Sequence, residues 1–435
     1  MRRFYLLFLA GLFLAVRVKA VDVYGAASSA QSVALGGLFA GSGSGPTDSL
    51  AANPAALTFI GRPLLEVSGM GVLAHGAYQN STPYLGSLSN SAGLAGSAAF
   101  ASRVGASRIS LGVGVFPVSL LSDQWRYADP AGTAGVSYGI QTNKSAFIAL
   151  QPTVGIGIQV TKRLAVGAGF GILYNANTLE TPYIFQNNAL SGLKTLLNLH
   201  TNGVGYNGTI GAIFTATRTL EFDLAYKTET TVHTTGTANS NASAQFAALG
   251  LPFQPTFRYT AEVNNTFPQS VSANIAWQAR RRIRTHLQAD WINWRSAFVN
   301  LPVHLTGGAN PDINALLGSS SLDDSIPLAW RNQLAWRAGM EASVTENATV
   351  LGGYSYTNSP VPSRTLTPMT ADIMRNALST GISYHRSRYR FELAYQANLP
   401  SSAEVGTSQL LAGEYDHSKT SLWLQTIVLT TGIRF

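Results

Sequence analysis

Residues 164–177, LAVGAGFGILYNAN, carry the pattern that decides the fold. Every second side chain is apolar, from Leu164 through Phe170 to Tyr174, and small or polar residues such as Gly169 and Asn175 take the opposite face. Because successive side chains of a β-strand point to opposite faces, the pattern predicts a strand with one apolar and one polar face. Residues 389–399 repeat it. The apolar face must be buried in lipid or in a protein core.

Features near the two ends of the sequence favour lipid. Arg2 and Arg3 precede an apolar run over residues 4–16, and the small residue Ala20 follows, which predicts a cleavable secretory signal peptide over residues 1–20. The last residue, Phe435, belongs to a strand-like segment, and an aromatic residue at this place is typical of bacterial outer-membrane barrels. We therefore expect the protein to reside in the bacterial outer membrane.

The composition agrees with a membrane barrel. Charged residues make up 11% of the 435 residues, which is low for a soluble surface of this size. No segment after the signal peptide reaches the roughly 18 apolar residues of a membrane helix. Lipid tolerates no unpaired strand edge, so a closed barrel remains. The predicted fold class is all-β: a transmembrane antiparallel β-barrel.

Charge and cysteine content restrict the partners. With no cysteine there is neither a disulfide nor a thiolate metal site, and we expect no cofactor. The formal charge of +8 falls to +4 when the four basic residues of the signal peptide are removed. That excess suits contact with anionic lipid in the outer leaflet of the outer membrane, including lipopolysaccharide, and it is too weak to indicate nucleic acid. We expect a monomer.

The number of strands can be counted along the chain. Tight turns alternate with long loops, as in outer-membrane barrels. Fourteen segments read as strands: 63–78, 91–103, 106–121, 143–160, 163–180, 204–217, 219–236, 257–278, 283–299, 328–344, 347–357, 376–386, 388–399 and 420–435.

The segment before the first strand is of another kind. Residues 21–58 are rich in Gly, Ser and Ala and show no period of two. Fourteen strands enclose a lumen too wide for side chains alone to fill. We therefore predict a plug, or hatch, over residues 21–60 with Asn53, Pro54 and Ala55 at its fixed end, followed by the barrel over residues 61–435. The alternative is a disordered periplasmic tail.

Several motifs resemble the FadL family of outer-membrane transporters (OMPP1/FadL/TodX). They are Asn53-Pro54-Ala55, Ala225-Tyr226-Lys227, Asp290-Trp291, and Gly352-Gly353-Tyr354-Ser355-Tyr356 running into Ser359-Pro360-Val361-Pro362. The resemblance implies a fourteen-stranded barrel with an N-terminal hatch. It also implies passive movement of long-chain fatty acids or hydrocarbons, with sideways release through a gap in the wall. The basic residues that contact the headgroup in fatty-acid transporters have no counterpart that we can identify.

Two long loops carry apolar side chains that suit ligand capture. In residues 181–203, Leu190, Leu193, Leu196 and Leu197 fall at helical spacing after Phe185, which predicts an amphipathic helix. A second loop holds Phe246 and Phe253. Apolar loops that face water need a partner. The two loops form either a landing groove for a hydrophobic solute or a lid in which they pack on each other.

Two arginines are candidates for a ligand headgroup. On the strand that begins at Leu328, Arg331 and Arg337 lie on the inward face. A guanidinium group can hold a carboxylate by two parallel hydrogen bonds. The other interpretation is structural: these arginines pair with acidic residues across the lumen or hold the plug.

The sequence favours a channel over an enzyme. Residues 203–208, GVGYNG, match a dinucleotide fingerprint, but they open a strand and lack the βαβ unit that the motif requires. No nucleophile elbow or zinc-site motif is present, so no catalysis is expected, although a barrel lipase is an alternative. The predicted function is passive uptake of hydrophobic molecules that are captured by outer loops and released after hatch movement. The runner-up is a structural or adhesive barrel, and a general porin is the third possibility.

Overall fold

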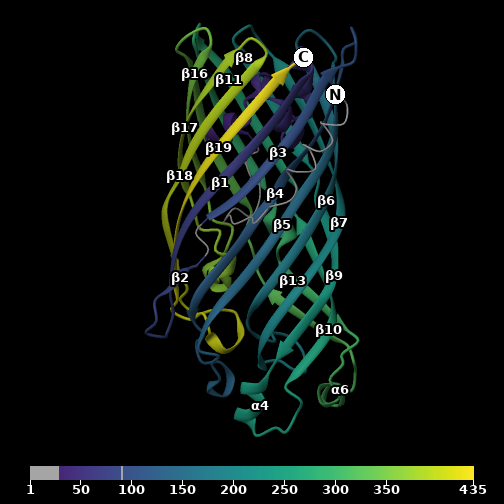
Figure 1. Cartoon of the computed structure of the whole chain (residues 1–435), viewed down its shortest axis with the longest axis vertical. Coiled ribbons are helices and arrows are strands. Elements are labelled where there is room, and N and C mark those ends of the chain that lie inside the picture. Colours follow the sequence, from purple (N-terminus) through teal and green to yellow (C-terminus); the bar gives the residue numbers. More distant parts are fainter. Residues whose placement is uncertain (1–28, 90–91) are drawn as a thin grey trace, which may run out of the picture.

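The computed structural model describes residues 29–89 and 92–435; the expected signal peptide and the first part of the predicted hatch lie outside the described residues. Nineteen strand segments form one sheet that closes on itself into a barrel (Figure 1). The barrel closes where β1 (Leu64–Gln79) pairs antiparallel with β19 (Lys419–Arg434) along its whole length. Closure leaves no unpaired edge at this seam.

The nineteen segments make fourteen strands, which confirms the predicted fold. Nine strands are continuous: β1, β4 (Ile109–Ala128), β5 (Ile140–Gln159), β6 (Leu164–Ile184), β7 (Lys194–Thr215), β16 (Ala348–Thr357), β17 (Asn376–Arg386), β18 (Tyr389–Glu404) and β19. Five are interrupted: β2 (Gly86–Leu88) with β3 (Ala92–Arg103), β8 (Leu220–Lys227) with β9 (Thr230–Asn241), β10 (Thr256–Phe267) with β11 (Ser270–Arg280), β12 (Ile283–Ile292) with β13 (Asn300–Thr306), and β14 (Leu322–Pro327) with β15 (Gln333–Ser343). Each interrupted pair continues along the same neighbours, so it counts as one strand.

The two ends of the barrel differ. Short turns lie at the end that holds the C-terminus, which is the periplasmic end, and long loops with helices α4 (Ser243–Leu249) and α6 (Pro311–Leu317) lie at the other (Figure 1). The strands run further toward the loops than the sequence predicted. In particular, the helix predicted over residues 181–203 is wrong: Leu196 lies in β7, opposite Pro182 of β6 and Asn241 of β9. Pairing on both sides outweighs the helical spacing of the leucines.

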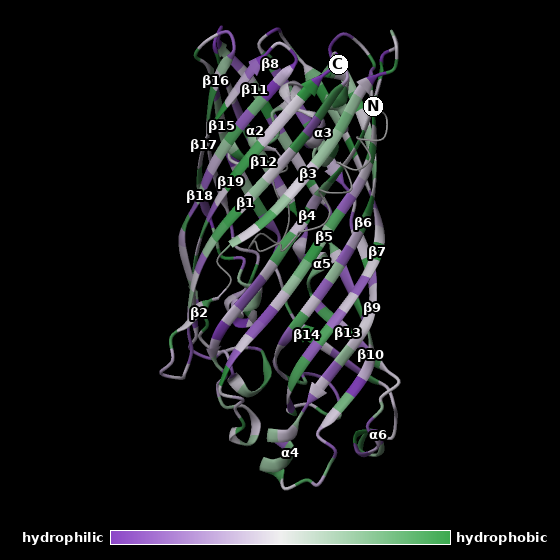
Figure 2. Cartoon of the chain, in the orientation of Figure 1, coloured by the Kyte–Doolittle hydropathy of each residue, from purple (hydrophilic) through white to green (hydrophobic). Residues whose placement is uncertain are grey.

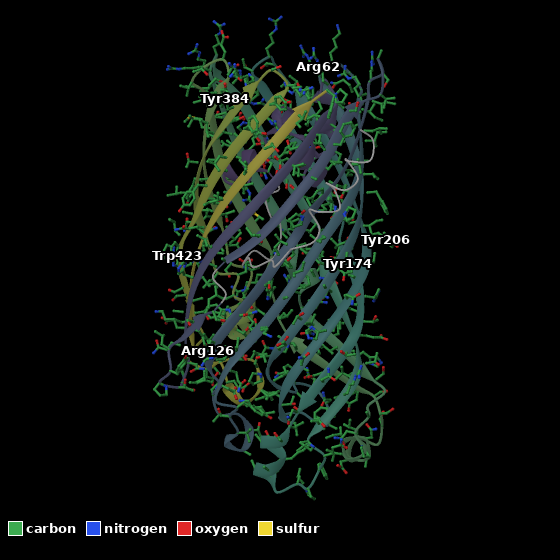
Figure 3. All side chains as sticks on the ribbon, in the orientation of Figure 1. Arg62, Arg126, Tyr174, Tyr206, Tyr384 and Trp423 are labelled. Atoms are coloured by element: carbon green, nitrogen blue, oxygen red, sulfur yellow. The ribbon has the colours of Figure 1, made fainter. Side chains whose placement is uncertain are left out.

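The strands have the two faces that the sequence pattern predicts. Apolar and polar residues alternate along them in Figure 2. Phe170 is 51% exposed on the outer face and stacks on Tyr206 with ring centroids 6.0 Å apart, whereas a Cβ on inward Gly169 would lie 3.3 Å from Pro54 Cγ. Tyr174 and Tyr206 project from the outer surface in Figure 3. No helix in the described residues is long and apolar enough to cross a membrane.

A charge on the outer face should destabilise the barrel. We expect Phe170→Arg to lower the free energy of unfolding by about 2–4 kcal/mol, because a guanidinium group near the bilayer midplane loses its hydration. Urea titration of the protein folded in vesicles measures the change. Phe170→Leu, which stays apolar, is the matched control. Equal stability of the Arg and Leu variants would show that Phe170 does not face hydrocarbon.

The described part of the hatch fills the periplasmic half of the lumen. It consists of α2 (Ala30–Ala34), η1 (Gly41–Gly43), α3 (Pro46–Ala51) and η2 (Pro54–Phe59), most of whose residues are buried. Asn53 caps η2: its Oδ1 accepts from Ala55 N at 3.1 Å, and Pro54 occupies the first position of the turn. The Asn53 amide also donates to wall carbonyls of Ala212 and Leu224 at 3.3 and 3.4 Å.

Glycine on the inner wall makes room for the hatch. A Cβ on Gly167 would lie 2.3 Å from the backbone N of Ala55, and a Cβ on Gly353 would lie 2.2 Å from the backbone C of Leu35. Such contacts between backbone atoms cannot be relieved by rotating a side chain. The hatch therefore packs on the small residues of the inner wall. In the sequence these residues were visible only as the positions that alternate with the apolar ones.

Candidate functional site

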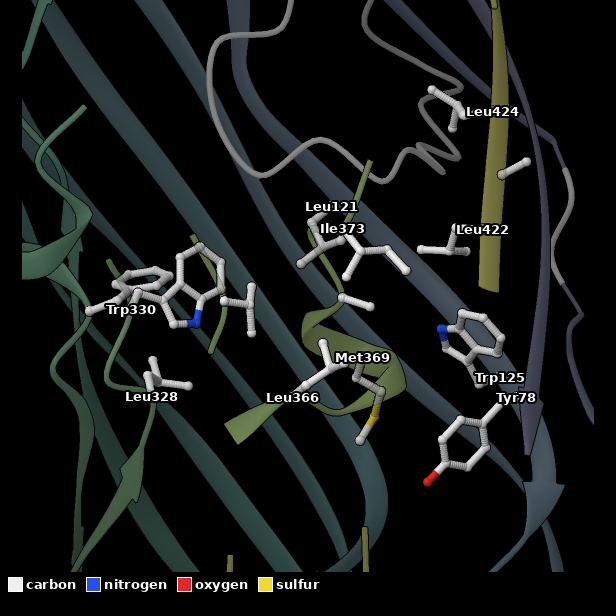
Figure 4. Packing of buried hydrophobic residues seen from close by; sticks show 14 of the residues in the cluster. Tyr78, Leu121, Trp125, Leu328, Trp330, Leu366, Met369, Ile373, Leu422 and Leu424 are labelled. Atoms are coloured by element: carbon white, nitrogen blue, oxygen red, sulfur yellow. The ribbon is translucent and has the colours of Figure 1, made fainter. Parts of the chain in front are cut away.

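The lumen beyond the hatch is narrowed by three segments that leave the wall. The first is α5 (Trp294–Ala297), which interrupts the strand between β12 and β13, and the second is residues 328–332 between β14 and β15. The third is the loop 358–375, with η4 (Ser363–Thr365) and η5 (Pro368–Thr370), which enters the barrel (Figure 4). Thr365 Oγ1 donates to Leu328 O at 2.6 Å and joins the last two segments.

An aromatic cluster forms where these segments meet. Trp330 lies 4.9 Å from both Trp294 and Phe298 between ring centroids, and Phe298 lies 6.1 Å from Phe147 of the wall. The indole N–H of Trp330 is buried and has no acceptor among the described residues. Rings at these distances and tilts favour a further aromatic ring, either edge to face or with its π-face toward the N–H.

A cavity of about 210 Å³ lies next to this cluster, toward the outer loops. Its lining is mostly apolar and includes Phe147, Phe185, Leu301, Trp330 and Met369. An apolar cavity of about 150 Å³ stays dry and binds benzene in another protein. The cavity therefore has room for one substituted aromatic ring or a short stretch of alkyl chain.

The charged residues that line the cavity are all acidic. They are Asp324 and Glu414, and no Lys, Arg or His contributes to the described lining. Asp324 accepts from Tyr183 Oη at 2.6 Å and from the backbone N of Asn187 at 2.8 Å, and it is 5% exposed. These donors are neutral, and among the described residues no Lys, Arg or His forms an ion pair with the Asp324 carboxyl group.

A buried ion cluster holds the outer loops together. Lys194, at the start of β7, lies 2.8 Å from Asp129 Oδ1 and 2.5 Å from Glu414 Oε1, and its Nζ also donates to Pro130 O at 2.7 Å. Asp129 lies after β4, and Glu414 lies before β19. One ammonium group between two buried carboxylates cannot compensate both. Burial, with a smaller effect of Asp129, therefore raises the pKa of Glu414 to about 7 even though Lys194 lowers it.

The closed arrangement of these loops should depend on pH. In the closed state the pKa of Glu414 rises from 4.5 to about 7. Protonation of Glu414 therefore stabilises the closed loops fully below about pH 4.5, and this stabilisation is lost as the pH rises through about 7. We expect protease nicking of the loop 405–418 to be faster at pH 8 than at pH 5.5, relative to an unstructured peptide cut by the same protease. Glu414→Gln should remove most of this difference. A pH dependence that persists in Glu414→Gln would assign it to another group.

The wall has a gap in its hydrogen-bond ladder between β3 and β4. Within the described residues these strands pair from Arg103 opposite Ser110 only as far as Ala98 opposite Val115, and the ladder resumes between β2 and β4 at Leu88 opposite Trp125. β4 carries a register shift between Pro117 and Ser119 on its other side. The sequence signal is Pro117, because proline inside a strand is confined to edges and bulges.

The gap faces both luminal cavities. Phe116, Pro117 and Val118 line a second cavity of about 150 Å³ between the hatch and the wall, and Leu121 lines the first cavity. Residues 116–121 of β4 are all buried, so both faces of the strand are covered over this stretch. The cavities and the gap thus lie along one stretch of β4.

The structure distributes the ligand-binding candidates over several places. Phe185 lines the first cavity. Leu196 lines a shallow outer groove with Phe257. Leu193, Phe246 and Phe253 belong to a hydrophobic cluster under the outer loops, in which the rings of Phe246 and Phe253 are 5.6 Å apart.

The two arginine candidates lie apart from the first cavity. Arg337 Nε donates to Asp290 Oδ2 at 2.7 Å, and Arg337 Nη1 donates to Gly36 O of the hatch at 3.1 Å. Arg331 is exposed, and its backbone N donates to Pro360 O at 2.8 Å. The sequence did not identify Trp294, Trp330 or Asp324 as site residues. Trp294 and Trp330 lie between strand segments, shortly after β12 and shortly before β15.

Fold and site together define a class: a fourteen-stranded outer-membrane barrel with a luminal hatch, an apolar cavity and a gap in its wall. The sequence profile of the family described as outer membrane protein transport protein (OMPP1/FadL/TodX) matches residues 13–396. The chain belongs to this family. No curated protein sequence matches the chain.

Solved structures of two toluene transporters and of a FadL homologue share the fold. The toluene transporter TbuX of Ralstonia pickettii has a TM-score of 0.73 and 20% identity, covering 94% of this chain and 98% of its own. The toluene transporter TodX of P. putida has a TM-score of 0.75 and 17% identity, with 95% and 99% covered. A Pseudomonas aeruginosa FadL homologue has a TM-score of 0.74 and 15% identity, with 95% and 99% covered.

Proposed function

We propose that this protein admits small, neutral hydrophobic molecules of about the size of one substituted aromatic ring through the outer membrane. The observation that carries the proposal is the apolar cavity of about 210 Å³ whose described charged lining residues are both acidic. The aromatic cluster around Trp330 supports an aromatic ligand. Proteins of similar fold include toluene transporters, which supports the same class of substrate.

Electrostatics disfavours a fatty acid carboxylate in this cavity. Two like charges roughly 8 Å apart repel by about 2 kcal/mol at the effective dielectric constant of a protein site. Asp324 would exert this repulsion on a bound carboxylate, whereas a neutral ring would experience none. A fatty acid is therefore the less favoured substrate, and a neutral hydrocarbon is the favoured one.

The route runs from the outer loops through the cavity to the wall. A solute enters near Phe185, moves past the aromatic cluster along β4, and leaves through the gap between β3 and β4 after the hatch shifts. Apolar transfer into the cavity supplies the driving force for capture. We keep Phe185, Leu193, Leu196, Phe246 and Phe253 as capture residues.

Uptake by cells tests the proposal. A host that lacks its own channel of this class is compared with and without this protein, using labelled toluene and labelled oleate. We expect toluene uptake to rise several-fold and oleate uptake to change little. Met369→Glu, which places a charge in the cavity, should abolish the gain, and Leu249→Ser, in the exposed part of α4, should retain it. A gain for oleate alone would overturn the choice of substrate.

Further expectations belong to the proposal. Residues 1–20 are removed as a signal peptide, residues 21–60 form the hatch and residues 61–435 the barrel. The protein acts as a monomer, with lipopolysaccharide around its outer end. We expect it to have no catalytic activity.

A further inference from the structure

The periplasmic end of the barrel is densely basic. The exposed basic side chains of its turns and termini are Arg62, Arg103, Arg108, Lys162, Arg163, Arg218, Arg280, Arg281, Arg282, Arg386, Arg388 and Arg434. We call these twelve residues the basic rim. The described turns at this end contribute one exposed acidic side chain, Glu346. Figure 3 shows Arg62 at this end and nitrogen-tipped side chains that project beyond the strands.

The rim corrects our interpretation of the net charge. The sequence led us to assign the positive excess to contact with outer-leaflet lipid. In the structure, the largest group of exposed basic side chains lies at the opposite end of the barrel. The excess positive charge therefore faces the inner leaflet and the periplasm.

The protein itself does not neutralise the rim. Within residues 29–89 and 92–435, no ion pair of 4 Å or less involves any of the twelve side chains. Their described contacts are with neutral groups: Arg103 Nη2 donates to Thr58 O at 3.3 Å, Arg108 Nη1 to Val160 O at 3.4 Å, and Arg388 lies 5.1 Å from the ring of Tyr389. Most donors of these guanidinium groups remain free for an outside acceptor.

The rim lies directly beside the lipid-facing surface. Val104 follows Arg103 and is 46% exposed, Phe214 precedes Arg218 and is 45% exposed, and Tyr389 follows Arg388. Long basic side chains next to an apolar belt reach the level of lipid headgroups. Guanidinium groups there can hold phosphate by two hydrogen bonds.

We propose that the basic rim binds the phosphate headgroups of anionic phospholipids in the inner leaflet of the outer membrane. The charges are spread over five of the six strand-connecting turns at this end and over both termini of the barrel, so they encircle it. A protein partner would need a compact patch on one side, whereas a lipid annulus contacts the whole circumference. The ring form of the charge therefore favours lipid.

Tryptophan fluorescence can test this contact. Trp277 is 53% exposed and lies three residues before Arg280. The full mature protein is placed in vesicles with Trp291, Trp336 and Trp423 replaced by Phe, so that Trp277 reports on lipid. Brominated phosphatidylglycerol and brominated phosphatidylcholine, each diluted in unlabelled phosphatidylcholine, act as contact quenchers. We expect quenching of Trp277 by phosphatidylglycerol to correspond to a local concentration of this lipid roughly fivefold above that in the bulk bilayer. One basic residue near an anionic lipid surface contributes about this factor.

Charge removal provides the decisive comparison. Replacing Arg280, Arg281 and Arg282 with Gln should abolish the preference for phosphatidylglycerol. Replacing Arg126, Arg258 and Lys419, which are exposed at the outer end, with Gln should leave it unchanged. A heat-dependent gel shift verifies that both variants are folded. Equal quenching by the two lipids in the parent protein, or a preference that survives loss of the three rim arginines, would overturn the proposal.

Discussion

Replacing Gly167 and Gly353 with valine should convert a nearly closed protein into an ion-conducting pore. Each new side chain would overlap backbone atoms of the hatch, near Ala55 in one case and Leu35 in the other. Overpacking of this kind costs about 1–3 kcal/mol per site. The hatch will yield before the wall does, because the wall is held by continuous ladders on both sides of each glycine.

Single-channel recording in planar bilayers measures this effect. We expect the parent protein to be almost silent and the double variant to show discrete conducting steps, as should a variant that lacks residues 30–50. Gly69→Val is the control, because nothing lies within 4 Å of its added Cβ. Silence of the double variant, with barrel assembly verified on a gel, would mean that the hatch tolerates displacement without opening a path. Conduction by the parent protein would restore the porin alternative.

The regular parts of the fold could be predicted from the sequence. The alternation of apolar and polar residues, the turn residues and the aromatic last residue are all visible in the local sequence. A sheet that spans a membrane must also close into a barrel, because lipid leaves no hydrogen-bond partner for an open edge. The count of fourteen strands followed directly. The extension of β6 to Ile184 and of β7 back to Lys194 could not be predicted, since it depends on pairing between segments far apart in the chain.

The candidate site was harder to predict. Its parts come from α5, residues 328–332 and the loop 358–375, each of which interrupts or leaves the strand pattern. A break in a pattern shows where regular pairing ends, but not that Trp294 and Trp330 meet with their rings 4.9 Å apart. The charge of the cavity was equally hidden, because Asp324 stands next to Asp323 and the sequence does not show which one turns inward.

Lys194→Met should open the outer loops at neutral pH. The ammonium group is fully buried and forms ion pairs with both Asp129 and Glu414, which come from two different loops. Removing one partner of a buried ion pair typically costs about 3–5 kcal/mol, because the remaining charges are left without compensation. Glu414 and Tyr415 line the cavity, so opening of their loop should also weaken ligand binding.

Proteolysis of the loop 405–418 and toluene binding, measured on the folded protein, report the two consequences. Lys419→Met is the matched control, because its pair with Glu404 is exposed and contributes little. A triple variant with Lys194→Met, Asp129→Asn and Glu414→Gln should recover much of the loss, since replacing an entire buried ion cluster by neutral groups is often tolerated. If Lys194→Met alone behaved like the parent protein in both measurements, the prediction would be wrong. The apolar contacts of the loops, and not the ion cluster, would then hold them closed.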